Sequence, residues 1–128
     1  MSRELVRRAR EVMQNAYAPY SHFRVGAAIE ADDGSIHVGC NVENASYGLT
    51  ICAERMAVGA AVAAGRQRLA RLAVATAVEP PATPCGACRQ LLAEFGLDLE
   101  IVTVGPTSER HWTLRDLLPE AFTRESLT

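Results

Sequence analysis

The sequence predicts an α/β fold built around a partly parallel sheet. Three observations carry this prediction. Apolar residues recur at helical spacing near the N-terminus, two strand-like segments then flank a strong turn signal, and strand and helix patterns alternate through the rest of the chain. Alternation of strands and helices implies crossover connections and parallel pairing, whereas the short turn implies an antiparallel hairpin at one side.

The first predicted element is an amphipathic helix. Its apolar positions recur every three or four residues, and arginines lie between them; these positions are Leu5, Val6, Ala9, Val12, Met13 and Ala16. Interleaved Glu4 and Glu11 favour a solvated helix face over an RNA-binding one. A turn over residues 18–21, Ala-Pro-Tyr-Ser, is expected to end the helix.

A hairpin is predicted next. Residues 23–31 and 36–41 are the two strands, because Asp32-Asp33-Gly34-Ser35 between them is a strong turn signal. Asn41 and Glu43 alternate with Val42 at the end of the second strand, so their side chains are expected to point to the same side. An ordinary loop is the alternative interpretation of this segment.

The helix predicted over residues 53–64 is apolar on almost every side after Arg55, and Gly65 is its expected C-cap. A helix that is apolar all round is normally buried all round. A chain of this size can hardly cover it alone, which predicts that the helix packs against other subunits. The high helix propensity of alanine is a milder explanation of the same composition.

The C-terminal half supplies the remaining elements. Apolar strands are predicted over residues 69–78 and 99–104, and a helix over residues 85–95 ends at Gly96. A short last strand is expected within residues 108–112, followed by a capped helical turn over residues 113–116. The two helices at residues 53 and 85 should begin at the edge of the sheet where α/β proteins bind ligands.

The composition indicates one domain spanning residues 1–128. Hydrophobic residues make up 48% of the 128, the net charge is −2 and the pI is about 5.9, which disfavours binding to a nucleic acid. No apolar run reaches transmembrane length, and the first residues, Met-Ser-Arg-Glu, do not resemble the start of a signal peptide. Free thiols fit a reducing compartment, so a cytoplasmic location is expected.

Three cysteines and one glutamate have the pattern of a catalytic zinc site. Cys85 and Cys88 lie three residues apart and share one helix face, near an N-terminus that lowers the pKa of a thiol. Thr83 is the expected N-cap, with Pro84 at the first helical position. Cys52 can be the third ligand, which leaves a fourth position for water.

Glu54 follows Cys52 by two residues, close enough to exchange a proton with that water without binding the metal. Three thiolates around one Zn²⁺ carry an excess negative charge. Arg55, and less directly Arg89, are predicted to offset that charge by donating hydrogen bonds to the sulfurs.

Two other uses of the cysteines remain open. Cys40 could complete a closed structural site with four cysteines, but it stands alone after Val38-Gly39 and fits a small apolar residue at a strand end. A disulfide framework is less consistent with a chain of this length. Glu54 favours catalysis, because a purely structural site does not need it.

The cysteine and glutamate motifs match the zinc deaminase pattern of a glutamate followed by Pro-Cys-x-x-Cys. The chain resembles the small, homotetrameric cytidine deaminases that act on free nucleosides. The resemblance covers nearly the whole chain and rests on residues 16–21, 23–28, 39–47, 50–55, 84–89 and 117–122. It implies a three-layer α/β/α sandwich around a five-stranded mixed sheet, one zinc ion per chain, and deamination of cytidine and 2′-deoxycytidine in pyrimidine salvage.

The resemblance also implies the roles of individual residues. Phe23 would lie against the base, Asn41 and Glu43 would bind the ribose hydroxyls, and backbone groups near Ala53 and Pro84 would meet the base edge. Tyr47 would lie near a subunit boundary and the pocket, and Phe122 would reach a neighbouring subunit's pocket and help to close it over the base. A blasticidin S deaminase-like activity and a non-catalytic zinc-stabilised binding module are the alternatives; deamination within polynucleotides would need a basic groove that the composition does not indicate.

Overall fold

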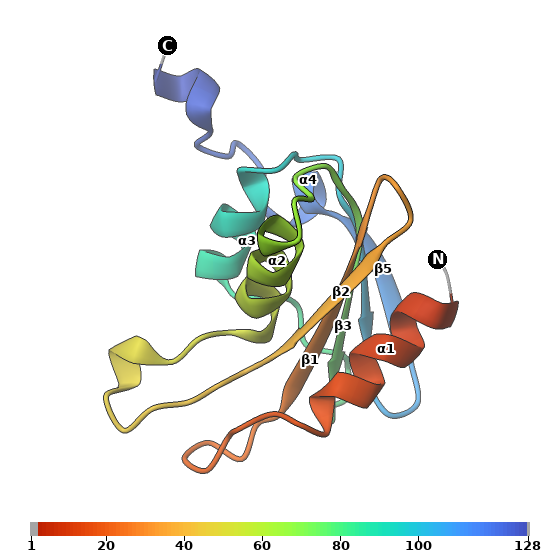
Figure 1. The fold of residues 1–128 in the computed structure, drawn as a ribbon, viewed down its shortest axis with the longest axis vertical. Coiled ribbons are helices and arrows are strands. Elements are labelled where there is room, and N and C mark those ends of the chain that lie inside the picture. The colour runs from red at the N-terminus through yellow and green to blue at the C-terminus, as the bar shows by residue number, and fades with distance from the viewer. Residues whose placement is uncertain (1–2, 128) are drawn as a thin grey trace.

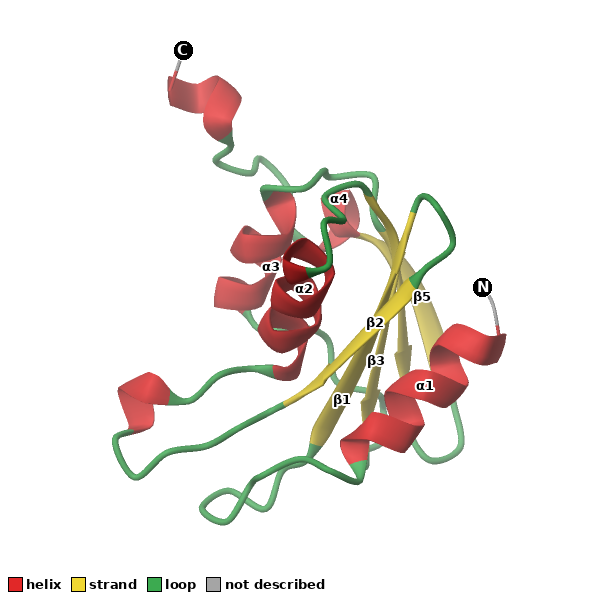
Figure 2. Cartoon of the chain, viewed as in Figure 1, coloured by secondary structure: helices red, strands yellow, loops and turns green. Residues whose placement is uncertain are grey.

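The computed structural model describes residues 3–127. Figure 1 shows one mixed sheet with helices on both faces, and Figure 2 separates the helices from the strands by colour. The five strands lie in the order β2-β1-β3-β4-β5. Their bounds are Val25–Ala31 (β1), Ile36–Cys40 (β2), Leu69–Thr76 (β3), Glu100–Val104 (β4) and Glu109–Thr113 (β5).

The sheet is parallel only at its centre. β3 pairs parallel with β4, whereas β1 pairs antiparallel with β2 and β3, and β5 pairs antiparallel with β4. The α-helices are α1 (Arg3–Met13), α2 (Ala53–Ala63), α3 (Gly86–Ala93) and α4 (Leu114–Leu117), and short 3₁₀ helices span Tyr47–Leu49 (η1) and Arg124–Leu127 (η2). The helix α3 connects the two parallel strands. Because the sheet is mixed and helices cover both of its faces, the predicted three-layer sandwich is confirmed.

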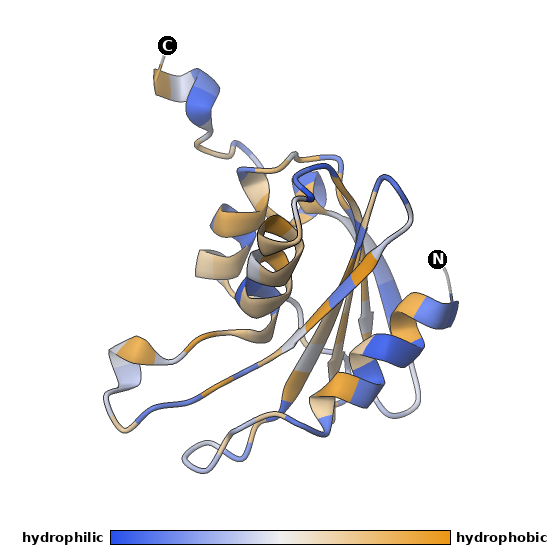
Figure 3. Cartoon of the chain, viewed as in Figure 1, coloured by the Kyte–Doolittle hydropathy of each residue, from blue (hydrophilic) through white to orange (hydrophobic). Residues whose placement is uncertain are grey.

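Two apolar layers hold the helices on the sheet. Alternation along the strands sends Ile29, Leu72 and Val74 towards α2 and α3, and sends Ala28 and Ala73 towards α1. The α1 side therefore presents small side chains to Leu5 and Ala9, which are fully buried. Figure 3 shows the matching amphipathic pattern of α1, with hydrophobic and hydrophilic residues on different sides of the helix.

Two glycines let helices approach the sheet closely. A Cβ on Gly26 would collide with the carbonyl oxygen of Ala9 in α1. On the other face, a Cβ on Gly39 would collide with the backbone nitrogen of Ala57 and lie 2.7 Å from the carbonyl oxygen of Ala53. Only glycine lacks the atom that would clash, so both positions set the distance between helix and sheet.

The helix ends correct two details of the sequence analysis. The N-cap of α3 is Cys85 and not Thr83, whose hydroxyl instead accepts a hydrogen bond from Arg89 at 2.8 Å. The C-cap of α2 is Ala64, and Gly65 lies one residue later with a φ of +85°. Gly65 therefore provides the left-handed conformation that commonly follows a helix. The last helical turn, α4, has the predicted cap, since Thr113 and Asp116 form a reciprocal capping box.

Two segments extend from the body of the molecule: the loop from β2 to α2, which contains η1, and the C-terminal segment with η2 (Figure 1). Both carry exposed hydrophobic side chains. Tyr47 is 76% exposed and Phe122 is 58% exposed. Within residues 3–127, no helix is long and apolar enough to cross a membrane.

Candidate active site and metal centre

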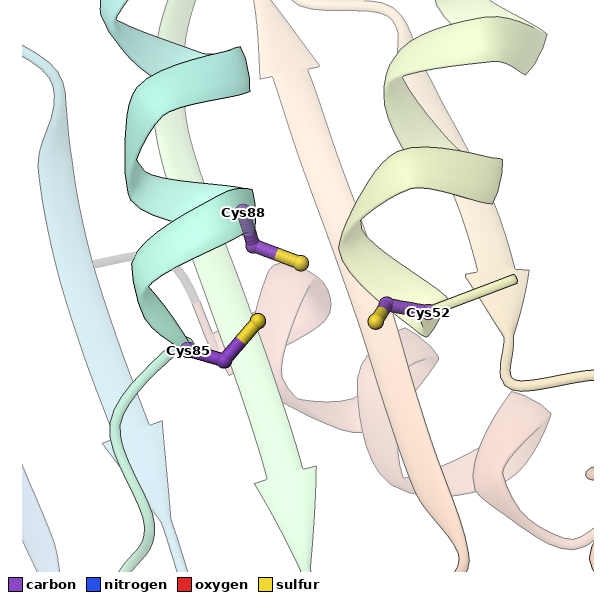
Figure 4. Close-up of side chains that lie close together, drawn as sticks. All are labelled: Cys52, Cys85 and Cys88. Atoms are coloured by element: carbon purple, nitrogen blue, oxygen red, sulfur yellow. The ribbon is translucent and has the colours of Figure 1, made fainter. Parts of the chain in front are cut away.

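The N-termini of α2 and α3 bring three thiols together. Cys52 is the N-cap of α2 and Cys85 the N-cap of α3, while Cys88 lies in the first turn of α3. Their sulfur atoms lie within 4.8 Å of one another. Figure 4 shows the three side chains directed into the space between the two helices. The spacing of the motifs thus predicted correctly which cysteines meet.

These thiols fit a zinc ion in number and chemistry. Three sulfur ligands leave one tetrahedral position for a water molecule or a substrate, as in catalytic zinc sites. Cys40, at the end of β2, is not part of the group of metal-binding side chains found among residues 3–127. The alternative of a four-cysteine closed site therefore lacks its fourth ligand.

The electrostatics of the cluster favour a bound cation. Burial, together with the nearby Glu54 and Cys52, raises the pKa of the Cys88 thiol, and burial is also the main cause of the raised pKa of Cys52. Burial opposes ionisation of Cys85 as well, but hydrogen bonds from the backbone N–H groups of Cys88 and Ala87 and from the Cys88 thiol outweigh it and lower its pKa. A divalent cation would offset the cost of three thiolates in one place.

Glu54 is a buried carboxyl group directly beside the thiols. It lies in the first turn of α2, two residues after Cys52, and is only 5% exposed. Burial raises the pKa of its carboxyl group, which favours the protonated form relative to a solvated glutamate. A carboxyl group that can both hold and release a proton is suited to general acid–base catalysis.

An apolar cavity of about 200 Å³ opens next to Glu54 and two of the thiols. Of the predicted substrate-binding residues, Phe23, Asn41 and Ala53 line it, together with the predicted catalytic and metal-binding residues Glu54, Cys52 and Cys85. The remaining lining residues are Val25, Thr50, Val74, Thr76, Ala82 and Thr83. A larger and more open groove of about 730 Å³ between α1 and the β4–β5 connection includes none of the thiols. The smaller cavity therefore has the chemistry of a binding site.

Glu43 lies outside the residues that line the cavity. Its carboxylate accepts hydrogen bonds from the backbone N–H groups of Tyr20 and Ser21 and from the Ser21 hydroxyl. These bonds, the Ser21 hydroxyl first, lower the pKa of Glu43, so the group is ionised at neutral pH. Tyr47 packs edge to face against Tyr20, with ring centroids 6.1 Å apart. Glu43 and Tyr47 thus connect the loop between β2 and α2 to the loop between α1 and β1, which contains Tyr20 and Ser21.

Three other predicted residues lie apart from the thiols or the cavity. Within residues 3–127 no hydrogen bond joins Arg55 to a sulfur, and the side chain is exposed, so its role at the ligands stays a prediction. For Arg89 the prediction is wrong, because its Nε donates to the Pro84 carbonyl and its two Nη atoms donate to Leu117 and Thr83. Phe122 does not line the cavity of its own chain.

Thr76 is a lining residue that was not predicted from the sequence. Thr76 ends β3, and two-residue alternation places it on the same face as Leu72 and Val74. That alternation is visible in the sequence. The helices at residues 53 and 85 were predicted to begin at the ligand-binding edge of the sheet, which lies at the carboxyl ends of parallel strands, so the two signals together could have identified Thr76.

The fold has three α/β/α layers, two helices begin at cysteines, and a buried glutamate lies in the first turn of one of them. This combination fits the class of zinc-dependent hydrolases. The comparisons with known proteins are specific. The cytidine and deoxycytidylate deaminase zinc-binding region matches residues 1–104. The chain therefore belongs to the cytidine deaminase family.

Individual relatives cover almost the full length. A cytidine deaminase of Sporosarcina psychrophila is 42% identical over 98% of this chain and 93% of its own. One from Mycobacterium tuberculosis is 46% identical over 93% of this chain and 87% of its own. The crystal structure of cytidine deaminase from Burkholderia pseudomallei superimposes with a TM-score of 0.91 and 46% identity, covering 95% of this chain and all of that one.

Proposed function

We propose that this protein catalyses the hydrolytic deamination of cytidine and 2′-deoxycytidine, giving uridine or 2′-deoxyuridine and ammonia. One observation carries the proposal: a buried carboxyl group, Glu54, lines an apolar cavity together with two of three clustered thiols, in a chain of the cytidine deaminase family. The whole chain, residues 1–128, is taken as one catalytic domain that works in the cytoplasm in pyrimidine salvage.

Cys52, Cys85 and Cys88 would hold one Zn²⁺ per chain. The proposal is supported by the thiol donor set and by the mutual approach of the sulfurs to within 4.8 Å. A zinc ion bound there would lower the pKa of a water molecule and so supply the nucleophile. The protein contributes the position of the ligands and the exclusion of bulk water from the adjoining cavity.

Glu54 would carry the protons of the reaction. It accepts one proton from the attacking water and passes it to N3 of the cytosine ring as oxygen bonds to C4. It then takes the remaining proton from the new C4 hydroxyl and passes it to the departing amino group, so that the C4–N bond breaks, a C4 carbonyl forms and ammonia leaves. Its burial supports this role, because a raised pKa brings proton uptake and release closer to neutral pH.

Phe23 and Ala53 would contact the base, since both line the cavity. Asn41 and Glu43 would bind the ribose hydroxyls at its outer end. The sugar would then share the Glu43 carboxylate with Ser21, which already donates to it. This sharing is feasible because a carboxylate has about four acceptor positions.

Tyr47 and Phe122 would complete the pocket from neighbouring copies in a homotetramer. Support comes from the apolar residues on the outer side of α2, where Met56 and Val62 are exposed, and from exposed Tyr47 and Phe122 on the two extended segments. Sedimentation equilibrium tests the assembly. A single species with four times the mass of the chain is expected, and a monomer at all concentrations would remove this part of the proposal.

Ultraviolet absorbance of cytidine tests the reaction. Addition of the purified protein should convert cytidine to uridine, treatment with a chelator should stop the conversion, and Zn²⁺ should restore it. Turnover of blasticidin S in preference to cytidine would support the related aminohydrolase instead. Zinc bound at one ion per chain without turnover of either compound would support a non-catalytic module.

A further inference from the structure

Thr76 is a buried polar residue of the cavity whose hydroxyl has no protein partner. Its side chain is 4% exposed, and Oγ1 is fully shielded and makes no hydrogen bond with any residue in the range 3–127. Such a group costs free energy comparable to that of a lost hydrogen bond, and native proteins contain few of them. A buried hydroxyl without a partner at this position therefore requires an explanation, and a hydrogen bond to a bound ligand would provide one.

The strand geometry directs Thr76 into the cavity. Thr76 follows Val74 on the same face of β3 and pairs with Val25 of β1, and all three side chains line the cavity. That face packs towards α2 and α3, the helices that carry the thiols. Cys52, Glu54 and Cys85 line the same cavity, so a molecule that fills it meets both the thiol cluster and Thr76.

The other polar lining residues outside the thiol and Glu54 cluster already have partners. Thr50 accepts from Asn44 N–H at 3.3 Å, and Thr83 accepts from Arg89 at 2.8 Å. The Asn41 amide pairs at both ends with the backbone of residues 23 and 25. Thr76 thus differs from these residues, because its side chain makes no hydrogen bond within residues 3–127.

The second shielded atom without a hydrogen bond in residues 3–127 is unlike Thr76. It is Oε1 of Glu30, which lies 3.6 Å from the Arg71 guanidinium and so has a charged neighbour. Glu30 also lies away from the cavity. Of these two atoms, the Thr76 hydroxyl is therefore the one that belongs to a residue lining the cavity.

We propose that Thr76 is a specificity-determining residue whose hydroxyl forms a hydrogen bond with the pyrimidine ring of the bound substrate. A threonine hydroxyl can donate and accept, so it can pair with a ring nitrogen, a carbonyl oxygen or an exocyclic amino group. The exposed lining of the cavity is largely apolar, and a hydroxyl in its wall would favour a polar heterocycle over a hydrocarbon ring of equal size. This inference rests on the proposed function.

Two substitutions test it, Thr76→Val and Thr76→Ser. Valine keeps the shape and removes the hydroxyl, whereas serine keeps the hydroxyl and removes a methyl group. Thr76→Val should reduce kcat/KM for cytidine and weaken binding of uridine, measured by calorimetry, by about tenfold or more, because one hydrogen bond to the ligand is lost. Thr76→Ser should stay within about threefold of the unsubstituted protein, since the hydroxyl remains.

Thr103→Val is the matched control. Thr103 is buried in β4, and its Oγ1 accepts a hydrogen bond from Trp112 Nε1 at 3.2 Å. Thr103→Val should lower the thermal midpoint and leave uridine affinity unchanged. Thr76→Val should leave the midpoint unchanged or raise it, because no hydrogen bond of the unliganded protein is lost.

Three results would overturn the inference: unchanged uridine affinity in Thr76→Val, an equal loss in Thr76→Ser and Thr76→Val, or a midpoint that falls in Thr76→Val as it does in Thr103→Val. Failure of the proposed function is a separate outcome. In that case the unsubstituted protein does not turn over cytidine. The affinity for uridine then still tests the role of Thr76.

Discussion

Asn41 and Phe23 are joined by a hydrogen bond in which Asn41 Nδ2 donates to the Phe23 carbonyl oxygen at 2.8 Å. The other end of the same amide, Oδ1, accepts from the N–H of Val25 at 2.9 Å. Asn41 is 7% exposed and lines the cavity together with both partners. It therefore fixes the backbone that forms one wall of the site, in addition to its proposed contact with the ribose.

Asn41→Ala should lower the free energy of unfolding by about 1–3 kcal/mol, because two backbone groups lose their partner inside the protein. Urea unfolding measures the change. Asn15→Ala is the control, since Asn15 is exposed and has no side-chain hydrogen bond within residues 3–127. Equal stability of the two variants would show that the Asn41 bridge contributes nothing.

Glu54→Gln should abolish most turnover, by about 10²–10⁴-fold, because the amide has nearly the shape of the carboxyl group but cannot carry a proton. Zinc content, measured by atomic absorption, should stay at one ion per chain. Glu94→Gln removes an exposed carboxylate that pairs with Arg124 and should keep full activity. Substantial turnover in Glu54→Gln would refute the proton-transfer role.

Cys88→Ser should lose zinc and activity together, since an alcohol is a much weaker zinc ligand than a thiolate. Cys40→Ser should retain both, because Cys40 lies outside the thiol cluster. Zinc content and cytidine turnover are measured on the same preparations. Retention of a tightly bound zinc ion in Cys88→Ser, or its loss in Cys40→Ser, would contradict the proposed ligand set.

Gly39→Ala should destabilise the protein by about 1–3 kcal/mol and reduce its zinc content, because the new Cβ collides with α2 just behind Cys52 and Glu54. Gly26→Ala creates a comparable collision with α1 on the opposite face. It should lower the midpoint of unfolding and leave the zinc content intact. A similar loss of zinc in both variants would mean that overall destabilisation, and not the position of α2, releases the ion.

Asp33 should make stability depend on pH in the acid range. Hydrogen bonds from the Ser35 hydroxyl and N–H, with Arg66 nearby, lower its pKa from 3.8 to about 2. Its stabilising contribution is therefore complete above pH 3.8 and is lost as the pH falls through about 2. The difference in unfolding free energy between the unsubstituted protein and Asp33→Asn should shrink over that interval, and an NMR titration should give the lowered pKa directly.

Most of the fold could be predicted because local patterns agree with it. The turn at residues 32–35 specifies the hairpin, and the nearly continuous apolar sequences of β1 and β3 are those of strands covered on both faces. The predicted strand over 69–78 ends two residues early, at Thr76, because Thr76 pairs with Val25, the first residue of β1. Backbone hydrogen bonds, and not side-chain type, decide that boundary.

The site was predictable where its residues lie close in the sequence and not where they meet only in space. Cys85 and Cys88 are placed by one helix turn, and Glu54 by its distance from Cys52 along the chain. The partners of Arg89, by contrast, include the carbonyl of Leu117, which is distant in sequence and presents no side-chain signal. Tertiary contacts to backbone groups cannot be inferred from residue types alone.

The three thiols belong to two helices that follow different strands, with Cys52 on α2 and the other two on α3. An ion shared between them would link these helices without a covalent bond. Its ligand set is complete only after both helices have packed on the same face of the sheet. Uptake of metal would then be thermodynamically coupled to folding of that layer, so that part of the binding free energy would appear as resistance of the loaded protein to unfolding.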